Sequence, residues 1–296
     1  MRRAVGSYFR DRFLRIVPGY VVALCVTAFL FAPVGSALND GTTYRLGDAL
    51  SYVAHNLPLY APYLFQENIG DTLDSGIPFP PVWNGPLWTL FYEALCYIAI
   101  ATIVSIFPRR ALGPVLLAAA VVLTGAELAI DNGTTLPDPL MRAVPLGLAF
   151  TLGALLWLYR DRVPVGPAAA LVSVAAVVVF GLVDQSAALS QLPYGVLLLY
   201  LGVTLPLTWV GRRRDISYGM YIYGWPVQVL LILAVPGLTI DAPIVVDITV
   251  VVAVTAVFAA ASWLLVEAPA LRYKKPVREA DEPTLAGAAD ANPRED

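Results

Sequence analysis

One carboxylate within a long apolar run is the side chain of this sequence best suited to chemistry in a membrane. Glu93 follows the turn from Asn84 to Pro86, and apolar residues continue to Phe107. Because proline suits the first turn of a helix, we expect a helix to begin at Pro86 and to place Glu93 about 10 Å along its axis. A carboxylate at hydrocarbon depth is costly and is usually kept for function. The alternative is a carboxylate that hydrogen-bonds to its own helix and only fixes packing.

The residues around Glu93 predict a polar patch with aromatic walls. Thr89, Glu93 and Tyr97 share one helix face because they lie four residues apart. Trp88 and Tyr92 lie on the neighbouring face by the same spacing. We expect this patch to face the interior of a helix bundle.

Three other ionisable residues are weaker candidates for chemistry. Arg142 begins a predicted span on the side where loops carry few basic residues. It can reach a lipid phosphate, or it can hold an anionic group of a substrate or Glu93 itself. Glu127 lies near the same boundary and is expected to reach toward water. His55 can titrate near neutrality and act as a general base, but it has no partner in the sequence and also fits an ordinary polar position.

Aromatic residues with hydroxyl groups form a stripe on a late predicted span. Ser217 opens this span, and Tyr218, Tyr221 and Trp225 follow at i, i+3 and i+7, before Pro226 kinks or loosens the helix. An interfacial aromatic belt explains Tyr218 well but explains Trp225, two turns deeper, less well.

The N-terminal region is strongly basic. Residues 1–15 contain one acid and five arginines: Arg2, Arg3, Arg10, Arg12 and Arg15. The arginines from position 10 onward can bind a phosphate-bearing donor, or they can act only as determinants of membrane orientation. A cleaved signal peptide, with small residues at 35–37 as its cleavage site, is the alternative to a retained span.

Composition identifies an integral membrane protein. Of 296 residues, 58% are hydrophobic and 14% are charged, and the mean hydropathy is +0.70. Soluble domains have nearly twice that charge, and repeated apolar runs of about 20 residues are typical of spanning helices. The net charge of -3 gives no support for nucleic-acid binding. Two cysteines within apolar runs and one histidine indicate neither a disulfide framework nor a metal site.

The apolar runs predict an all-α polytopic bundle of about eight transmembrane helices. The expected spans are 16–34, 87–107, 111–130, 139–159, 167–184, 193–210, 216–236 and 243–267. Lys and Arg cluster on alternate connections, so the positive-inside rule predicts that both termini lie in the cytoplasm. The expected location of the protein is the cytoplasmic membrane. The expected membrane domain is 1–275. This domain includes an outer loop at 35–86, in which residues 49–65 are expected to form a short interfacial or re-entrant helix. The acidic tail that follows, at 276–296, is expected to be disordered and cytoplasmic.

Three segments together resemble the acyltransferase-3 family of membrane proteins, which O-acylate sugars of cell envelopes, polysaccharides and small glycosylated molecules. They are Arg12-Phe-Leu-Arg15-Ile-Val-Pro-Gly-Tyr20, Asn84-Gly-Pro-Leu-Trp88-Thr-Leu-Phe-Tyr-Glu93 and Ser217-Tyr-Gly-Met-Tyr-Ile-Tyr-Gly-Trp-Pro226. No segment is specific alone, but the three follow the order of the family motifs. Family members usually have ten spans. Both additional spans would precede residue 1, and the first of them would carry the family's catalytic histidine. Gly224 occupies the position of a later family histidine.

The resemblance implies an O-acyltransferase that moves an acyl group, usually acetyl, from acyl-CoA to a hydroxyl of a sugar or envelope glycan. Acyl-CoA would be a co-substrate, with no bound cofactor, and the lipid bilayer would surround the protein. Glu93 would organise the site, with Arg142 as its electrostatic partner, and these two are the catalytic candidates. The substrate-binding candidates are Arg12, Arg15, Asn84, Trp88, Tyr92, Ser217, Tyr218, Tyr221 and Trp225.

Two other functions fit the same residues. Charged residues inside the membrane and broken helices are also features of a transporter or flippase, although such proteins usually contain paired repeats and no repeat of fixed period is visible. A chain without the catalytic histidine could also serve as a non-catalytic partner subunit.

Overall fold

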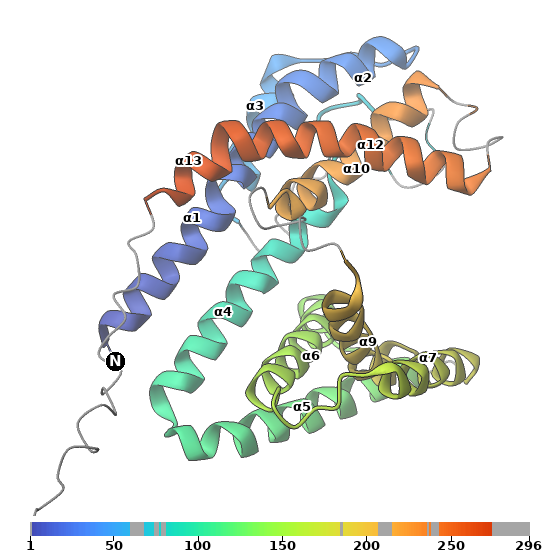
Figure 1. Ribbon diagram of the computed structural model, residues 1–296. Coiled ribbons are helices and arrows are strands. Elements are labelled where there is room, and N and C mark those ends of the chain that lie inside the picture. The colour runs from blue at the N-terminus through green and yellow to red at the C-terminus, as the bar shows by residue number, and fades with distance from the viewer. Residues whose placement is uncertain are drawn as a thin grey trace, which may run out of the picture.

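The computed structural model describes residues 2–59, 68–73, 77, 81–183, 186–206, 215–235, 237 and 243–273. Within these residues every regular element is a helix, as the sequence predicts (Figure 1). The predicted acidic tail at 276–296, the cluster Arg212 to Arg214 and the second half of the predicted 49–65 helix lie outside the described residues.

The first span is one long helix that extends farther than its sequence predicts. Helix α1 (Arg2–Val26) continues through a π-helical segment, η1 (Thr27–Phe31), into α2 (Ala32–Leu38). Residues 35–37, the possible signal cleavage site and the expected start of the outer loop, are therefore helical. The helix passes close to Trp83 here, since a Cβ atom on Gly35 would lie 2.5 Å from the Trp83 ring. Glycine lets the helix pass this tryptophan without interruption.

The segment after α2 folds back against α1. It contains α3 (Leu46–Asn56), which begins earlier than the predicted 49–65 helix and ends before Pro58. The Tyr20 hydroxyl donates to the carbonyl of Asn56 at 2.6 Å. Trp83, fully buried, donates from Nε1 to Thr72 Oγ1 at 2.8 Å. The described parts of the expected outer loop therefore pack against α1 and α2.

The remaining helices follow the predicted spans closely, except for one short helix, Ser186–Leu189, which lies between two of them. They are η3 (Gly85–Trp88), α4 (Thr89–Ile106), α5 (Arg109–Asp131), α6 (Asp138–Leu158), α7 (Pro167–Leu182), α8 (Ser186–Leu189), α9 (Gln191–Thr204), α10 (Ser217–Ala234), α12 (Ile244–Ser262), η4 (Trp263–Glu267) and α13 (Ala268–Leu271). Within the described residues, five helices are long and apolar enough to cross a membrane: 6–38, 85–106, 109–131, 138–158 and 244–271. The spans predicted at 167–184 and 193–210 fall on the shorter apolar helices α7 and α9, and the span at 216–236 falls on α10.

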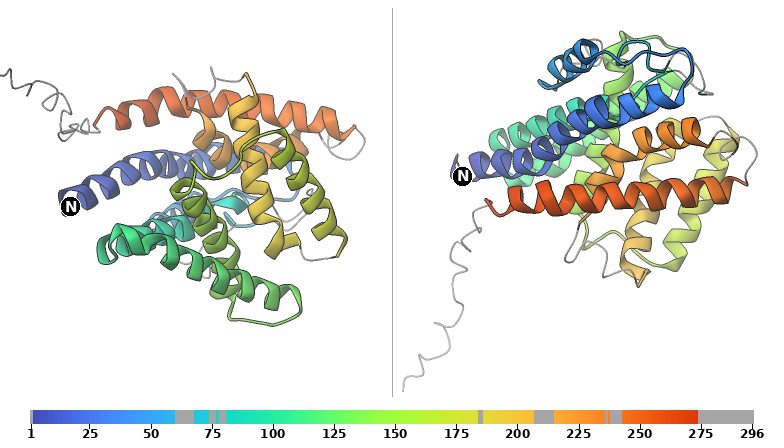
Figure 2. Two further views of the ribbon diagram at one scale, coloured as in Figure 1. Left: turned by 60° about the horizontal axis from the view of Figure 1, so that its bottom comes forward. Right: turned by 90° about the horizontal axis from the view of Figure 1, so that it is seen from above.

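The helices form two groups joined by α4. One group contains α1, α2, α3, α10 and α12, and the other contains α5, α6, α7 and α9 (Figures 1 and 2). The buried core lies in the first group, where Tyr20, Leu24, Phe31 and Ile222 are almost completely covered. Large apolar side chains of the second group are exposed, for example Leu171 and Leu182, as expected for surfaces that contact lipid.

Helices α10 and α12 pack closely because α10 has a glycine, Gly219, at their interface. A Cβ atom on Gly219 would lie 2.7 Å from the Cα atom of Ala259, so the two backbones approach as small residues allow in membranes. Gly219→Ala is expected to destabilise the protein by about 1–3 kcal/mol, since the helices must separate. A lower melting temperature in detergent would show this.

The matched control for this prediction lies in the same helix. A Cβ atom on Gly224 would contact nothing within 4 Å, so Gly224→Ala is expected to keep or raise the melting temperature. Equal melting temperatures for the Gly219→Ala protein and the unmodified protein would show that the close approach is not needed.

Candidate active site

The turn before α4 is attached to α10 by side chains from both segments. The three hydrogen bonds are Asn84 Nδ2 to the carbonyl of Ile222 (2.9 Å), Trp225 Nε1 to the carbonyl of Val82 (2.8 Å) and the Tyr221 hydroxyl to the carbonyl of Pro86 (2.8 Å). These bonds bring the second and third family-like segments together, although they are more than a hundred residues apart in the chain.

Asn84 fills a gap in the hydrogen bonding of α10. Pro226 lies four residues after Ile222 and has no N–H, so the Ile222 carbonyl has no partner of the usual kind within the helix. The buried amide of Asn84 donates to that carbonyl instead. The proline therefore creates the acceptor that places the start of α4.

This pairing predicts a coupling that a double-mutant cycle can measure. Asn84→Ala is expected to cost about 1–3 kcal/mol of unfolding free energy, because a buried carbonyl loses its donor. Pro226→Ala restores an N–H at the position that can bond to Ile222, so the same change should cost less in that background. Unfolding in detergent provides both values, and equal costs in the two backgrounds would contradict the assignment.

An aromatic cluster lies on the predicted outer side of the site. The hydroxyls of Thr89 and Tyr221 are hydrogen-bonded to each other. The rings of Trp88 and Tyr92 meet edge to face at 5.7 Å, and the guanidinium of Arg142 lies 5.0 Å from the centre of the Trp88 ring. Arg142 therefore contacts Trp88, and no ion pair joins it to Glu93 among the described residues. The sequence predicts Glu93 as the electrostatic partner of Arg142, but the structure shows a cation–π contact between Arg142 and Trp88 instead.

Glu93 lies between this cluster and a charged region that adjoins the next turn of α4, at Tyr97. Its carboxylate accepts a hydrogen bond from the Tyr97 hydroxyl, one helical turn away. The predicted face of Thr89, Glu93 and Tyr97 is therefore present, with polar contacts along its length. The structure adds that Arg12, from α1, lies 4.8 Å from the centre of the Tyr97 ring.

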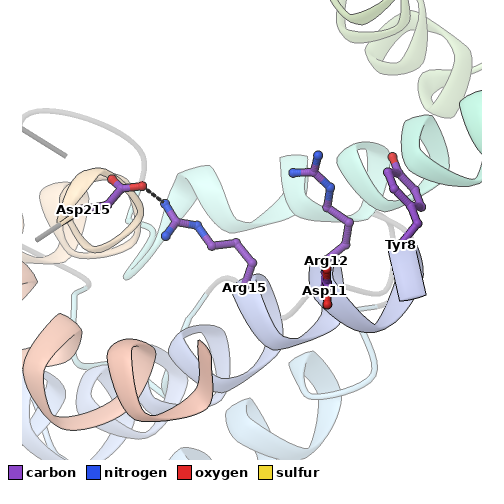
Figure 3. Close-up of a pocket in the computed structure, with 5 residues that line it drawn as sticks. All are labelled: Tyr8, Asp11, Arg12, Arg15 and Asp215. Carbon is purple, nitrogen blue, oxygen red and sulfur yellow. Dashed lines mark hydrogen bonds and ion pairs between the residues drawn. The ribbon is translucent and has the colours of Figure 1, made fainter. Parts of the chain in front are cut away.

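The charged region is a cavity of about 470 Å³ near the start of α1 (Figure 3). Its lining residues are Tyr8, Asp11, Arg12, Arg15 and Asp215. The first four come from α1, and Asp215 lies two residues before the start of α10. The charge pattern of the sequence predicts that this end of α1 faces the cytoplasm.

The two arginines of the cavity are held differently. Arg15 forms an ion pair with Asp215 at 2.5 Å, and the ring of Trp263 lies 5.9 Å from its guanidinium. Arg12 is exposed, and among the described residues it contacts the rings of Tyr8 and Tyr97 but no carboxylate. Arg12 is therefore well placed to bind an anionic ligand directly.

Asp215 is held in its charged form. Partial burial opposes ionisation, but the hydroxyl of Ser217, which donates at 2.6 Å, and the guanidinium of Arg15 together lower the pKa of Asp215 below its ordinary value. Ser217, expected to bind substrate, therefore contacts Asp215 at the edge of the cavity.

Tyr218 and Tyr92, both expected to bind substrate, form hydrogen bonds that join neighbouring helices. Tyr218 donates from its hydroxyl to the carbonyl of Ile16 at 2.9 Å, and this bond joins α10 to α1. Tyr92 is buried and donates to the carbonyl of Pro139 at 3.1 Å, which joins α4 to α6. Both residues position the helices that carry the site.

Two of the weaker ionisable candidates lie outside this site. The sequence predicts that Glu127 reaches toward water, and this is wrong, because Glu127 is only 4% exposed. The short helix α8 packs against α5 in this region, where Asp131 accepts from the backbone N–H of Ala188 at 3.3 Å. His55 is exposed on α3 and bonds to the carbonyl of Ser51 in its own helix.

Three residues near the cavity are additional to those expected from the sequence. Tyr8 lies four residues before Arg12 and shares its helix face, which is a signal visible in the sequence. Asp215 has no such signal. Glu267, 1% exposed, lies at the end of the π-helical segment η4 and accepts from Ser262 at 3.0 Å. π-helical turns are frequent at functional sites, and this one also carries Trp263 beside Arg15.

Comparison with known proteins identifies the family of this chain. The acyltransferase-3 family profile, described as "Acyltransferase domain", matches residues 1–267. The chain is 25% identical over 302 aligned positions to "Nodulation protein 10" of Rhizobium leguminosarum bv. viciae, covering 92% of this chain and 77% of the relative. It is 28% identical over 240 positions to "O-acetyl transferase" of Shigella phage Sf6, covering 76% and 67%. No solved structure matches. The profile covers most of the chain and all three motif segments, and the protein therefore belongs to the acyltransferase-3 family of multi-pass membrane acyltransferases.

Proposed function

We propose that the protein transfers an acetyl or similar acyl group from acyl-CoA to a hydroxyl of a sugar or envelope glycan in the cytoplasmic membrane. The observation that supports this best is the cavity at the start of α1, where Arg12 and the ion-paired Arg15 lie beside the segment that carries Glu93. The phage relative named "O-acetyl transferase" supports acetyl as the group and oxygen as its acceptor.

The arginine pair suits the phosphates of coenzyme A. A guanidinium presents a planar set of donors that can bind phosphate oxygens in pairs, and it remains charged at all physiological pH values. Arg12 can bind directly, while Arg15 must first exchange its Asp215 partner for the ligand. The charge pattern predicts that this cavity faces the cytoplasm, where acyl-CoA is present.

The aromatic cluster suits the acceptor. The sugar would approach from the predicted outer side, past the rings of Trp88, Tyr221 and Trp225, with Arg142 at the cluster. Asn84, in the turn before α4, bonds to α10, so it fixes the position of Tyr221 and Trp225 relative to α4. Glu93 lies between the two regions, where donor and acceptor groups would meet.

The transfer needs a nucleophilic hydroxyl, a base and stabilisation of the thioester oxygen. The acceptor oxygen attacks the thioester carbonyl, a C–O bond forms, and the C–S bond breaks. The proton of the hydroxyl leaves through the base and returns to the coenzyme A sulfur, which departs as a thiol. In this chain, Glu93 would orient polar groups around the reacting carbon, and the cavity arginines would hold the donor.

The direct test uses the protein expressed from its native locus. Membranes would be incubated with acetyl-CoA labelled in the acetyl group, and the envelope glycans would be analysed for labelled ester. We expect alkali-labile label on glycan only when the gene is present. Uptake of sugar into vesicles without any acyl donor, and without labelled ester, would instead support a transporter and overturn the proposal.

A further inference from the structure

Tyr97 connects the two halves of the proposed site. It lies on α4 one helical turn after Glu93, and its hydroxyl donates to the Glu93 carboxylate. The face of its ring lies beside Arg12, whose guanidinium is 4.8 Å from the ring centre. One side chain therefore contacts both the cation of the donor cavity and the carboxylate behind it.

The ring of Tyr97 is held by helices on two sides. Tyr8 of α1 meets it edge to face at 6.1 Å, and Phe150 of α6 meets it at 5.5 Å in the same way. These contacts fix the plane of the ring against rotation. The hydroxyl direction, and with it the Glu93 carboxylate, is fixed by the same contacts.

Arg12 depends on this ring for its position. It is exposed and has no carboxylate partner among the described residues, so aromatic rings provide its contacts in the cavity. A guanidinium over an aromatic face is attracted by the ring and is kept in a limited range of orientations. Removing the Tyr97 ring would leave Arg12 with only the Tyr8 ring of these two aromatic contacts, so more side-chain freedom would be lost when the donor binds.

We propose that Tyr97 is a positioning residue with two separable functions: its ring holds Arg12 for the donor phosphates, and its hydroxyl holds Glu93 for acyl transfer. This inference rests on the proposed function. It assigns the two effects to different atoms of one side chain, so two substitutions can separate them.

The test compares Tyr97→Phe with Tyr97→Leu in the labelled acetyl-CoA assay. Tyr97→Phe keeps the ring, so KM for the donor should remain within about twofold, while kcat should fall about tenfold because Glu93 loses its hydrogen bond. Tyr97→Leu removes both groups, so kcat should fall as much and KM for acetyl-CoA should also rise about tenfold. Tyr194→Phe, an exposed tyrosine on α9, is the control and should leave both constants unchanged.

A second comparison shows whether the hydroxyl acts through Glu93. If it does, adding Tyr97→Phe to Glu93→Gln should lower kcat little further, whereas independent effects would multiply. Multiplying effects, unchanged kcat in Tyr97→Phe, or unchanged KM in Tyr97→Leu would each overturn the corresponding part of the inference. These outcomes differ from failure of the proposed function, in which the unmodified protein itself transfers no acetyl group.

Melting temperatures separate positioning from general stability. A purely structural tyrosine would lower the amount of folded enzyme and reduce kcat in both variants without changing KM. The expected division, in which Phe retains the donor KM and Leu does not, requires a specific contact with Arg12. Equal donor KM values in folded Phe and Leu variants would contradict that contact.

Discussion

Replacing Glu93 with Gln is expected to lower kcat for acyl transfer about a hundredfold, within the range for groups that assist proton transfer or charge development. Gln has nearly the same size, and its side-chain carbonyl can still accept the hydrogen bond that the Tyr97 hydroxyl donates to Glu93. The substitution therefore removes the negative charge while it keeps the local packing.

The measurement is the initial rate of acetyl transfer at saturating donor, with the melting temperature measured in parallel. Glu127→Gln is the matched control, because Glu127 is also a carboxylate within a spanning helix but lies on α5, away from the residues that line the cavity. We expect the control to retain its turnover. A normally folded Glu93→Gln protein with unchanged kcat would exclude an essential contribution from this carboxylate.

Replacing Arg15 with Ala is expected to raise KM for acetyl-CoA about tenfold to a hundredfold, as for loss of a hydrogen bond to a charged group. Two effects contribute. The donor phosphates lose a guanidinium, and Asp215 loses the cation that lies 2.5 Å from it, so an uncompensated negative charge remains in the cavity. Both effects should weaken as salt is added, because the cavity is open to solvent and its charges are screened.

Two further variants separate these contributions. Arg15→Ala combined with Asp215→Asn removes the repulsion, so it should recover part of the donor affinity and show what the lost guanidinium alone costs. Arg15→Lys keeps the charge but loses the planar donor set, so an intermediate KM is expected. If KM in Arg15→Ala stays at the value of the unmodified protein, Arg15 does not contact the donor.

The pH dependence of donor binding follows from the charged state of Asp215. Its pKa lies below the ordinary value, so the Arg15–Asp215 pair stabilises the folded protein above that ordinary value and is lost only as pH falls through the lowered pKa. Between about pH 5 and pH 8, titration of Asp215 should therefore leave KM for acetyl-CoA unchanged. Within that range the proposed donor would open the pair by exchanging its phosphates for the Asp215 carboxylate.

The sequence by itself determined the helical character of the protein and the local face of its most informative segment. Backbone groups in a bilayer must bond within their own segment, so long apolar runs form helices whatever their neighbours are. The spacing of Thr89, Glu93 and Tyr97 then decides that they share a face, and the structure confirms it with a hydrogen bond from Tyr97 to Glu93. These results depend on residues within a few turns of one another.

The tertiary structure alone decided which of these faces meet. Asn84 bonds to a carbonyl that Pro226 leaves free, and Arg15 pairs with Asp215 from a segment 200 residues later in the chain. Arg142 contacts Trp88 and not Glu93. Helix periodicity has no information about the partner of each face, because that partner is chosen by packing between distant segments. The arrangement of the helices in space, and with it the contact of Arg12 with Tyr97, arises from that packing.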